Sequence, residues 1–132
     1  MKKKPIKKKL PSIKSLRNKL DKVFNAYIRL RDGKCILCDS KSKLQCSHYY
    51  GKHARPATRW YEYNAHAMCA RHHYLHHHGA EPDYSLFMFI KYGMAKMKIL
   101  KELSLFGIDY TRDELNRLIT LYTEKFNILN HK

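Results

Sequence analysis

The chain has 132 residues, a length that suits one small domain with a few appended helices, and 44% of them are hydrophobic, which is enough for an ordinary core. Lys and Arg number 27 against 11 Asp and Glu, so the formal net charge is +16 and nucleic acid is the simplest partner. No apolar run reaches the roughly 18 residues of a membrane span, and no apolar segment follows the N-terminal lysines. The sequence therefore predicts a soluble, unsecreted protein that has no membrane partner.

The first 14 residues are strongly basic, with seven lysines, two prolines and few hydrophobic side chains. We expect a basic disordered arm that gains phosphate contacts on binding, with Lys7, Lys8 and Lys9 among them. A tail that only improves solubility is the alternative.

A helix is predicted from Ser15 to the stop at Asp32 and Gly33. Hydrophobic side chains recur there at helical spacing: Leu16, Leu20, Val23, Phe24, Tyr27 and Ile28. This amphipathic helix leads into the first cysteine pair.

The middle of the chain is expected to be irregular. Residues 34–50 form a hairpin-like stretch whose strand carries His48, and residues 51–63 form a basic, aromatic connection. Residues 64–79 look like a turn that enters a helix, in which His66 supports the turn. Helices are then predicted over 83–92, over 94–105 and from Thr111, where Thr-x-x-Glu is a capping box.

Two ligand pairs predict a structural zinc site. A Cys-x2-Cys pair in a chain without a secretion signal more often binds metal or serves redox chemistry than forms disulfides. Cys35 and Cys38 are the first pair, and Cys69 and His72, three residues apart at the start of a helix, are the second. The 30 residues between the pairs are too many for a simple zinc finger and predict a functional insert, which holds His48 and Asn64.

Three alternatives stay open for these cysteines. Cys46 and His48 could close a local site with the first pair, or His73 could replace His72. A redox role for the first pair is the third, although no thioredoxin-like pattern surrounds it.

A series of short motifs runs along the chain: Leu20-Asp21-Lys22-Val23-Phe24, Tyr27-Ile28-Arg29-Leu30-Arg31-Asp32, Cys35-x2-Cys38, Gln45-Cys46-Ser47-His48, Thr58-Arg59-Trp60, Asn64-x-His66 and Cys69-x2-His72. In their order they resemble the phage NinG (Rap) recombination family, which looks like part of the wider HNH, or ββα-metal, nuclease class. The match covers roughly residues 20–93 and leaves the lysine arm and the C-terminal helices outside.

The resemblance implies an α+β fold with a small treble-clef zinc core and a ββα-metal (HNH-like) motif, flanked by N- and C-terminal helices. Residues 15–93 would be the zinc-bound nuclease domain with its N-terminal helix. Residues 94–132 would be a C-terminal helical extension.

The resemblance also implies catalytic roles. His48 would be the general base that takes a proton from the attacking water, and Asn64 would brace the catalytic loop. His73 would bind a catalytic divalent ion, Mg²⁺ or another, with His77 one helical turn on as a second ligand. His76 and His78 would be no more than an exposed helix end.

Basic side chains of the connection would bind DNA. Arg55 and Arg59 would clamp phosphates, with Lys52 beside them. The sequence departs from many HNH nucleases at Ser47, where an acidic metal ligand is usual, and Cys46 is expected to be a small buried side chain.

These features predict a metal-dependent DNA endonuclease, and the family suggests branched DNA such as Holliday junctions. A homodimer would fit two duplex arms, and a phage-encoded protein would act in the host cytoplasm. The leading rival is a non-catalytic zinc module that only binds nucleic acid. A histidine-rich metal carrier is a third hypothesis, which the basic charge disfavours.

Overall fold

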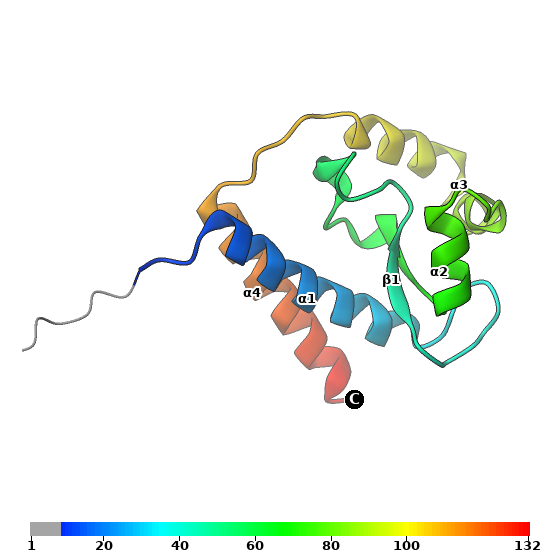
Figure 1. The fold of residues 1–132 in the computed structure, drawn as a ribbon, viewed down its shortest axis with the longest axis horizontal. Coiled ribbons are helices and arrows are strands. Elements are labelled where there is room, and N and C mark those ends of the chain that lie inside the picture. The colour runs from blue at the N-terminus through cyan, green and yellow to red at the C-terminus, as the bar shows by residue number, and fades with distance from the viewer. Residues whose placement is uncertain (1–8) are drawn as a thin grey trace, which may run out of the picture.

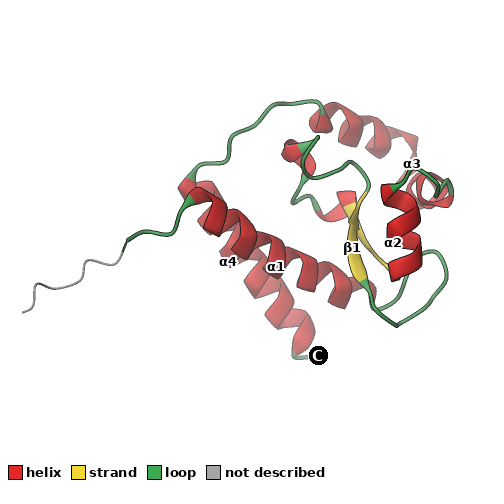
Figure 2. Ribbon diagram, viewed as in Figure 1, coloured by secondary structure: helices red, strands yellow, loops and turns green. Residues whose placement is uncertain are grey.

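The computed structural model describes residues 9–132. The elements are α1 (Ile13–Asp32), β1 (Gln45–His48), the 3₁₀ helices η1 (Pro56–Thr58) and η2 (Glu62–Asn64), β2 (Ala65–Met68), α2 (Ala70–His77), α3 (Asp83–Ser104) and α4 (Arg112–Asn130). A two-stranded sheet lies between α1 and α2, and α4 packs on α1 (Figures 1 and 2). The expected α+β class is confirmed. The predicted DNA contacts Lys7 and Lys8 lie outside the described residues, and Lys9 is exposed just before α1.

Helix α1 begins two residues before the predicted Ser15. The Ser12 side chain caps it by accepting a hydrogen bond from the Ser15 amide at 3.0 Å. At the other end Gly33 has a φ of 69°, a left-handed conformation that glycine adopts without steric cost. The predicted stop is therefore correct.

Helices α1 and α4 lie side by side and run in the same direction (Figure 1). Arg112 at the start of α4 donates to the carbonyl of Pro11, and the Tyr122 ring meets Phe24 edge-on with centroids 4.8 Å apart. Buried side chains from both helices form what we call the α1–α4 core: Leu16, Leu20, Phe24, Tyr27, Ile28, Trp60, Ala65, Leu115, Ile119 and Tyr122. The predicted capping box at Thr111 and Glu114 starts α4.

The two strands pair antiparallel, with Gln45 opposite Met68 and His48 opposite Ala65. The expectation of a turn over the first part of residues 64–79 is wrong, because β2 occupies 65–68. All four β2 residues are buried, so the strand lacks the alternation of polar and apolar side chains by which a half-exposed strand is recognised.

His66 is buried in β2 and does not support a turn. Its Nδ1 lies 3.0 Å from the Tyr84 hydroxyl and its Nε2 lies 2.6 Å from that of Tyr92. Since Tyr84 donates its proton to the Ser47 carbonyl at 2.9 Å, it accepts from Nδ1–H of His66, and Nε2 accepts from Tyr92. This network ties α3 to both strands.

Helix α3 is one element with a kink at Gly93, whose φ is 82° and ψ 164°. The kink separates the two helices predicted over 83–92 and 94–105. Side chains from both halves enter what we call the β2–α3 core: Cys35, Met68, Tyr84, Met88, Met97 and Leu100. Residues 94–132 thus contribute to both cores of the molecule.

No helix within residues 9–132 combines the length and the apolar character needed to cross a membrane.

Candidate metal centre and adjoining pocket

Cys35, Cys38, Cys69 and His72 converge into a candidate metal site, as the sequence predicts. Their ligand atoms all lie within 4.8 Å of one another. The Sγ atoms of Cys38 and Cys69 are 3.8 Å apart, and Nδ1 of His72 lies 3.2 Å from Sγ of Cys69 and 3.6 Å from Sγ of Cys35.

These distances match a tetrahedral zinc ion. With Zn–S bonds of about 2.3 Å, two sulfurs bound to one ion lie about 3.8 Å apart. Burial raises the pKa of Cys69, but hydrogen bonds from His72 and the other two cysteines outweigh it and lower that pKa to about 7. The thiolate that zinc requires is thereby favoured.

Local backbone structure positions both ligand pairs. The turn that carries Cys35 is closed by a bond from the Asp39 amide to the Cys35 carbonyl at 3.0 Å, and the Ile36 amide joins it to Ala67 of β2 at 3.1 Å. Cys69 is the N-cap of α2, so His72 lies one turn into that helix.

The sequence did not point to Glu81, which contributes a carboxylate behind the cluster. Its Oε2 lies 3.7 Å from Nε2 of His72, the ring nitrogen that faces away from the sulfurs, and its side chain is only 7% exposed. A carboxylate on the far side of a histidine ligand fixes its tautomer and orientation. No spacing rule identifies this role, because Glu81 reaches His72 only through the turn after α2.

Both alternative ligand sets are wrong. Cys46 is partly buried against the α1–α4 core and not fully buried as expected, and burial raises its thiol pKa to about 12. His48 is directed to the carbonyl oxygen of Arg59 and not to the cysteines. His73 lies on another face of α2 than His72.

A second feature adjoins the cluster across α2: a pocket of about 290 Å³. Its walls carry two of the three predicted catalytic residues and the second predicted ligand of the catalytic ion, together with basic and polar side chains. They include Asn25 and Arg29 from α1, His48 from β1, Lys52, and His73 and His77 from α2.

His48 is only 9% exposed and its tautomer is fixed. Its Nε2 lies 2.8 Å from the carbonyl oxygen of Arg59, which can only accept, so Nε2 carries the proton and Nδ1 keeps its lone pair. Burial lowers the pKa of His48 to about 4. A neutral imidazole with a free Nδ1 can accept a proton.

His76 is not the exposed helix end that was expected. It is half-buried, and its Nε2 lies 2.7 Å from the carbonyl oxygen of His48, to which it donates. It therefore fixes the backbone of β1 beside the pocket, whereas His78 is exposed.

His73 and His77 place their Nε2 atoms 3.1 Å apart. The other nitrogen of His73, Nδ1, lies 2.5 Å from Oγ of Ser47. Burial, followed by the charges of His77 and His76, lowers the pKa of His73 to about 4, and burial lowers that of His77 as well. Two imidazole nitrogens at this separation suit one metal ion, since bonds of about 2.05 Å would meet at about 95 to 100°.

Asn64 is fully buried and holds the connection that follows β1. Its Nδ2 donates to the carbonyls of Tyr50 at 3.1 Å and Thr58 at 3.0 Å, and its Oδ1 accepts from the Tyr50 amide at 3.0 Å. Asn64 thus joins both ends of this connection to β2, next to the carbonyl of Arg59 that orients His48.

The predicted phosphate contacts differ in availability. Lys52 lines the pocket, and its Nζ lies 3.8 Å from Asp21. Arg59 is largely buried and donates to both carboxylate oxygens of Asp21, so a phosphate there would compete with an existing ion pair. Arg55 donates to the Ser104 hydroxyl at 3.3 Å and lies over the Tyr50 ring.

Two pocket residues from α1 were missed by the sequence analysis. Arg29 forms no ion pair within residues 9–132, so its charge is open to a ligand. Oδ1 of Asn25 is buried without a hydrogen-bond partner in the same residues. Both lie on an amphipathic helix whose polar positions look ordinary in sequence, and only the tertiary fold brings them to His48.

Comparison with protein families matched one model, that of the bacteriophage Lambda NinG protein, over residues 1–132. The match is wider than the roughly 20–93 of the resemblance, because it includes the lysine arm and the C-terminal helices. No curated protein and no solved structure matched the chain. The chain therefore belongs to the NinG family, which is described by the bacteriophage Lambda NinG protein.

Proposed function

We propose that this protein is a metal-dependent DNA endonuclease of the HNH class. The observation that carries the proposal is the convergence in one pocket of three groups. They are His48 with a free Nδ1, the paired Nε2 atoms of His73 and His77, and the unpaired guanidinium of Arg29.

The residues supply the steps of phosphodiester hydrolysis. Nδ1 of His48 takes a proton from water, whose oxygen attacks phosphorus as the bond to the leaving oxygen breaks. Arg29 and Lys52 hold the phosphate in the pocket. A divalent ion bound by His73 and His77 would stabilise charge on the phosphate and on the leaving oxygen.

The chain order of the elements supports the class. Two antiparallel strands are followed by α2, with the predicted base on the first strand and the paired histidines on the helix. The Cys35–Cys38 turn and the start of α2 hold the candidate zinc site, an arrangement that suits a treble clef.

The ligand chemistry favours a transition metal at the catalytic site over Mg²⁺. Mg²⁺ prefers oxygen ligands, whereas His73 and His77 offer only imidazole nitrogens. Ser47 holds the position of the usual carboxylate and is hydrogen-bonded to Nδ1 of His73. We expect Mn²⁺, Co²⁺ or Ni²⁺ to support more cleavage than Mg²⁺ does.

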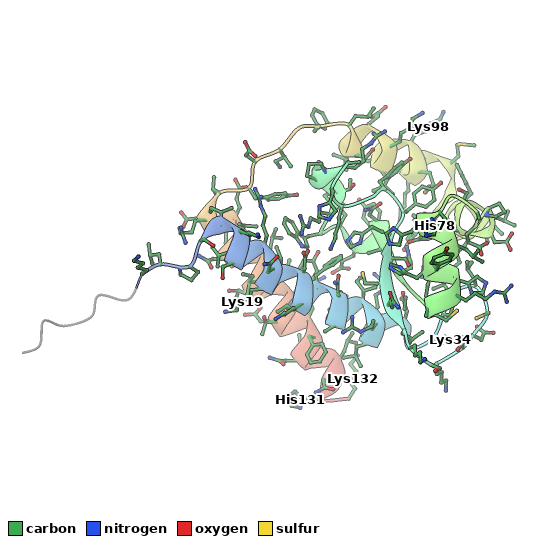
Figure 3. All side chains as sticks on the ribbon, viewed as in Figure 1. Lys19, Lys34, His78, Lys98, His131 and Lys132 are labelled. Carbon is green, nitrogen blue, oxygen red and sulfur yellow. The ribbon has the colours of Figure 1, made fainter. Side chains whose placement is uncertain are left out.

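Branched DNA, a homodimer and action in the host cytoplasm are parts of the proposal that rest on the family resemblance alone. Basic side chains do not single out one face: Figure 3 labels Lys19 on α1, Lys34 after α1 and Lys98 on α3, which project from different sides. The pocket, and not the net charge, locates the proposed contact with the cut strand.

The rival function is nucleic-acid binding without cleavage, which Ser47 favours because it removes a metal ligand. The test is cleavage of a four-way junction and of a matched duplex in Mg²⁺, Mn²⁺, Co²⁺ or Ni²⁺. We expect His48→Ala to lower the rate by about 10²- to 10⁴-fold, the usual contribution of a general base. His131→Ala, at the far end of α4 (Figure 3), is the matched control and should cut normally.

Binding without cutting in every ion would establish the rival. Equal cutting by wild type and His48→Ala would remove His48 as the base.

A further inference from the structure

A second basic pocket lies beside the first one and is not used by the proposed reaction. It has a volume of about 250 Å³, and its walls include Arg17, Lys52, His53, Arg59, Asp109 and Tyr110. Lys52 lines both pockets, so they are neighbours on the same side of the molecule.

Helix α1 connects the two pockets. Arg17 lines the second and Arg29 the first, and between them lie Asp21 and Asn25, each four residues from the next. Each neighbouring pair in this row is about 40° apart around the helix, so the row runs along α1 from one pocket to the other while turning by about 120°. The twelve steps from Arg17 to Arg29 correspond to about 18 Å along the helix axis at a rise of 1.5 Å per residue.

The second pocket is suited to a phosphate and not to a base. Trp60, the large aromatic ring in its wall, is buried, donates its Nε1–H to Asp21 at 3.0 Å and is packed edge-on by Tyr110. Its faces are therefore not open for stacking. Arg17, by contrast, is half-exposed and forms no ion pair within residues 9–132.

Charge distinguishes between kinds of phosphate. Arg17, Lys52 and Arg59 supply three positive charges, and Asp21, which holds Arg59, and Asp109 supply two negative charges. The sum of these five charges is one net positive charge. This matches the single negative charge of an internal phosphodiester better than the double charge of a terminal phosphate.

We propose that the second pocket binds an internal phosphodiester of the same DNA strand that is cut in the first pocket. The inference rests on the proposed function. Arg17 is the residue that makes the contact, and α1 sets the distance between the two phosphates. About 18 Å corresponds to about five nucleotides of B-form strand at 3.4 Å each, and to fewer in an extended strand.

The test uses full-length His48→Ala protein, which we expect to bind without cutting. Four-way junctions each carry one uncharged methylphosphonate, moved step by step along each strand in turn, and affinity is measured by fluorescence anisotropy. We expect two separate positions, no more than about five nucleotides apart, at which the substitution weakens binding by roughly tenfold.

We call the position held by the second pocket the far position and the one held by the first pocket the near position. Adding Arg17→Ala should abolish the penalty at the far position and leave the penalty at the near position. Arg17→Lys, which keeps the charge, should retain both penalties. Arg117→Ala is the matched control: Arg117 lies exposed on α4 and lines neither pocket, so both penalties should remain.

The proposal is overturned if only one sensitive position exists, or if Arg17→Ala weakens binding at all positions equally and leaves both penalties intact. Neither outcome depends on cutting. If wild type cuts no substrate but Arg17→Ala still abolishes the far penalty, the nuclease proposal fails and the second phosphate site stands. If wild type cuts and there is no far position, the nuclease proposal stands and the second phosphate site is rejected.

Discussion

The two candidate metal sites lie on either side of α2 and differ in kind. His72 belongs to a cluster with three cysteines, whereas its neighbour His73 faces the pocket that contains His48. Consecutive helix residues point about 100° apart, so one short helix serves both sites. The cluster has four ligands and is closed, as in structural zinc sites, whereas the pocket offers two imidazoles and leaves coordination positions open, as catalysis requires.

The two sites therefore differ in the effect that is expected when each one is disrupted. A closed thiolate site contributes its binding free energy to folding. An open site in a pocket affects substrate chemistry and local electrostatics, and the rest of the fold survives its loss.

Loss of the zinc cluster should unfold the protein. Cys35 is fully buried in the β2–α3 core, and structural zinc contributes an apparent 10 to 16 kcal/mol, about as much as the whole stability of a typical domain. We expect Cys35→Ala, or removal of metal with a chelator, to abolish the cooperative thermal transition followed by circular dichroism.

The matched control is Cys46→Ala, since Cys46 is a cysteine outside the cluster. It should keep one zinc ion per chain and a cooperative transition. A cooperatively folded, zinc-free Cys35→Ala protein would show that the cluster is not structural.

Acid should destabilise the fold through two buried histidines, His48 and His66. Burial lowers the pKa of His48 to about 4, and burial and then the charge of Arg31 lower that of His66 to about 3, against 6.5 when unfolded. Above pH 6.5 neither state is protonated, so stability is fully present. Below 6.5 only the unfolded chain gains protons, and each group removes about 1.4 kcal/mol per pH unit until its folded pKa is reached.

The measurement is the urea unfolding free energy between pH 7 and pH 4.5 with excess zinc, beside His48→Leu. The variant should lose about one unit of proton uptake and hence part of the slope. Because the candidate zinc cluster would also release its metal in acid, a cobalt-loaded sample should report its thiolate absorption band over the same range. A slope unchanged in His48→Leu would mean that His48 is not buried neutral.

The cluster could be predicted from sequence because its information is local. Cys35-x2-Cys38 and Cys69-x2-His72 each fit one turn of backbone, so the two pairs needed only to meet. Helix α1 could likewise be predicted from its helical spacing of hydrophobic residues, and the start of α4 from the capping box of Thr111 and Glu114.

The pocket depended on contacts between distant segments. Arg29 lines the same pocket as His48 only because α1 packs against β1 and β2. The ion pair of Arg59 with Asp21 joins residues that are 38 apart in the chain. β2 was missed because a strand buried on both faces carries no alternation. Single-sequence patterns report periodicity within an element and not which side chains from different elements meet.

The smallest effect concerns Glu81, which lies behind the cluster. Glu81→Gln keeps the shape of the side chain but removes the charge that faces Nε2 of His72, and loss of such a partner costs about 10- to 100-fold in metal affinity. Competition with a chromophoric chelator should show that loss while the thermal transition of the zinc-loaded protein stays cooperative. Glu124→Gln, at an exposed position of α4, is the matched control and should bind zinc normally. Equal zinc affinity in the two variants would mean that three thiolates alone orient the ion, and that Glu81 serves only to fix the turn after α2.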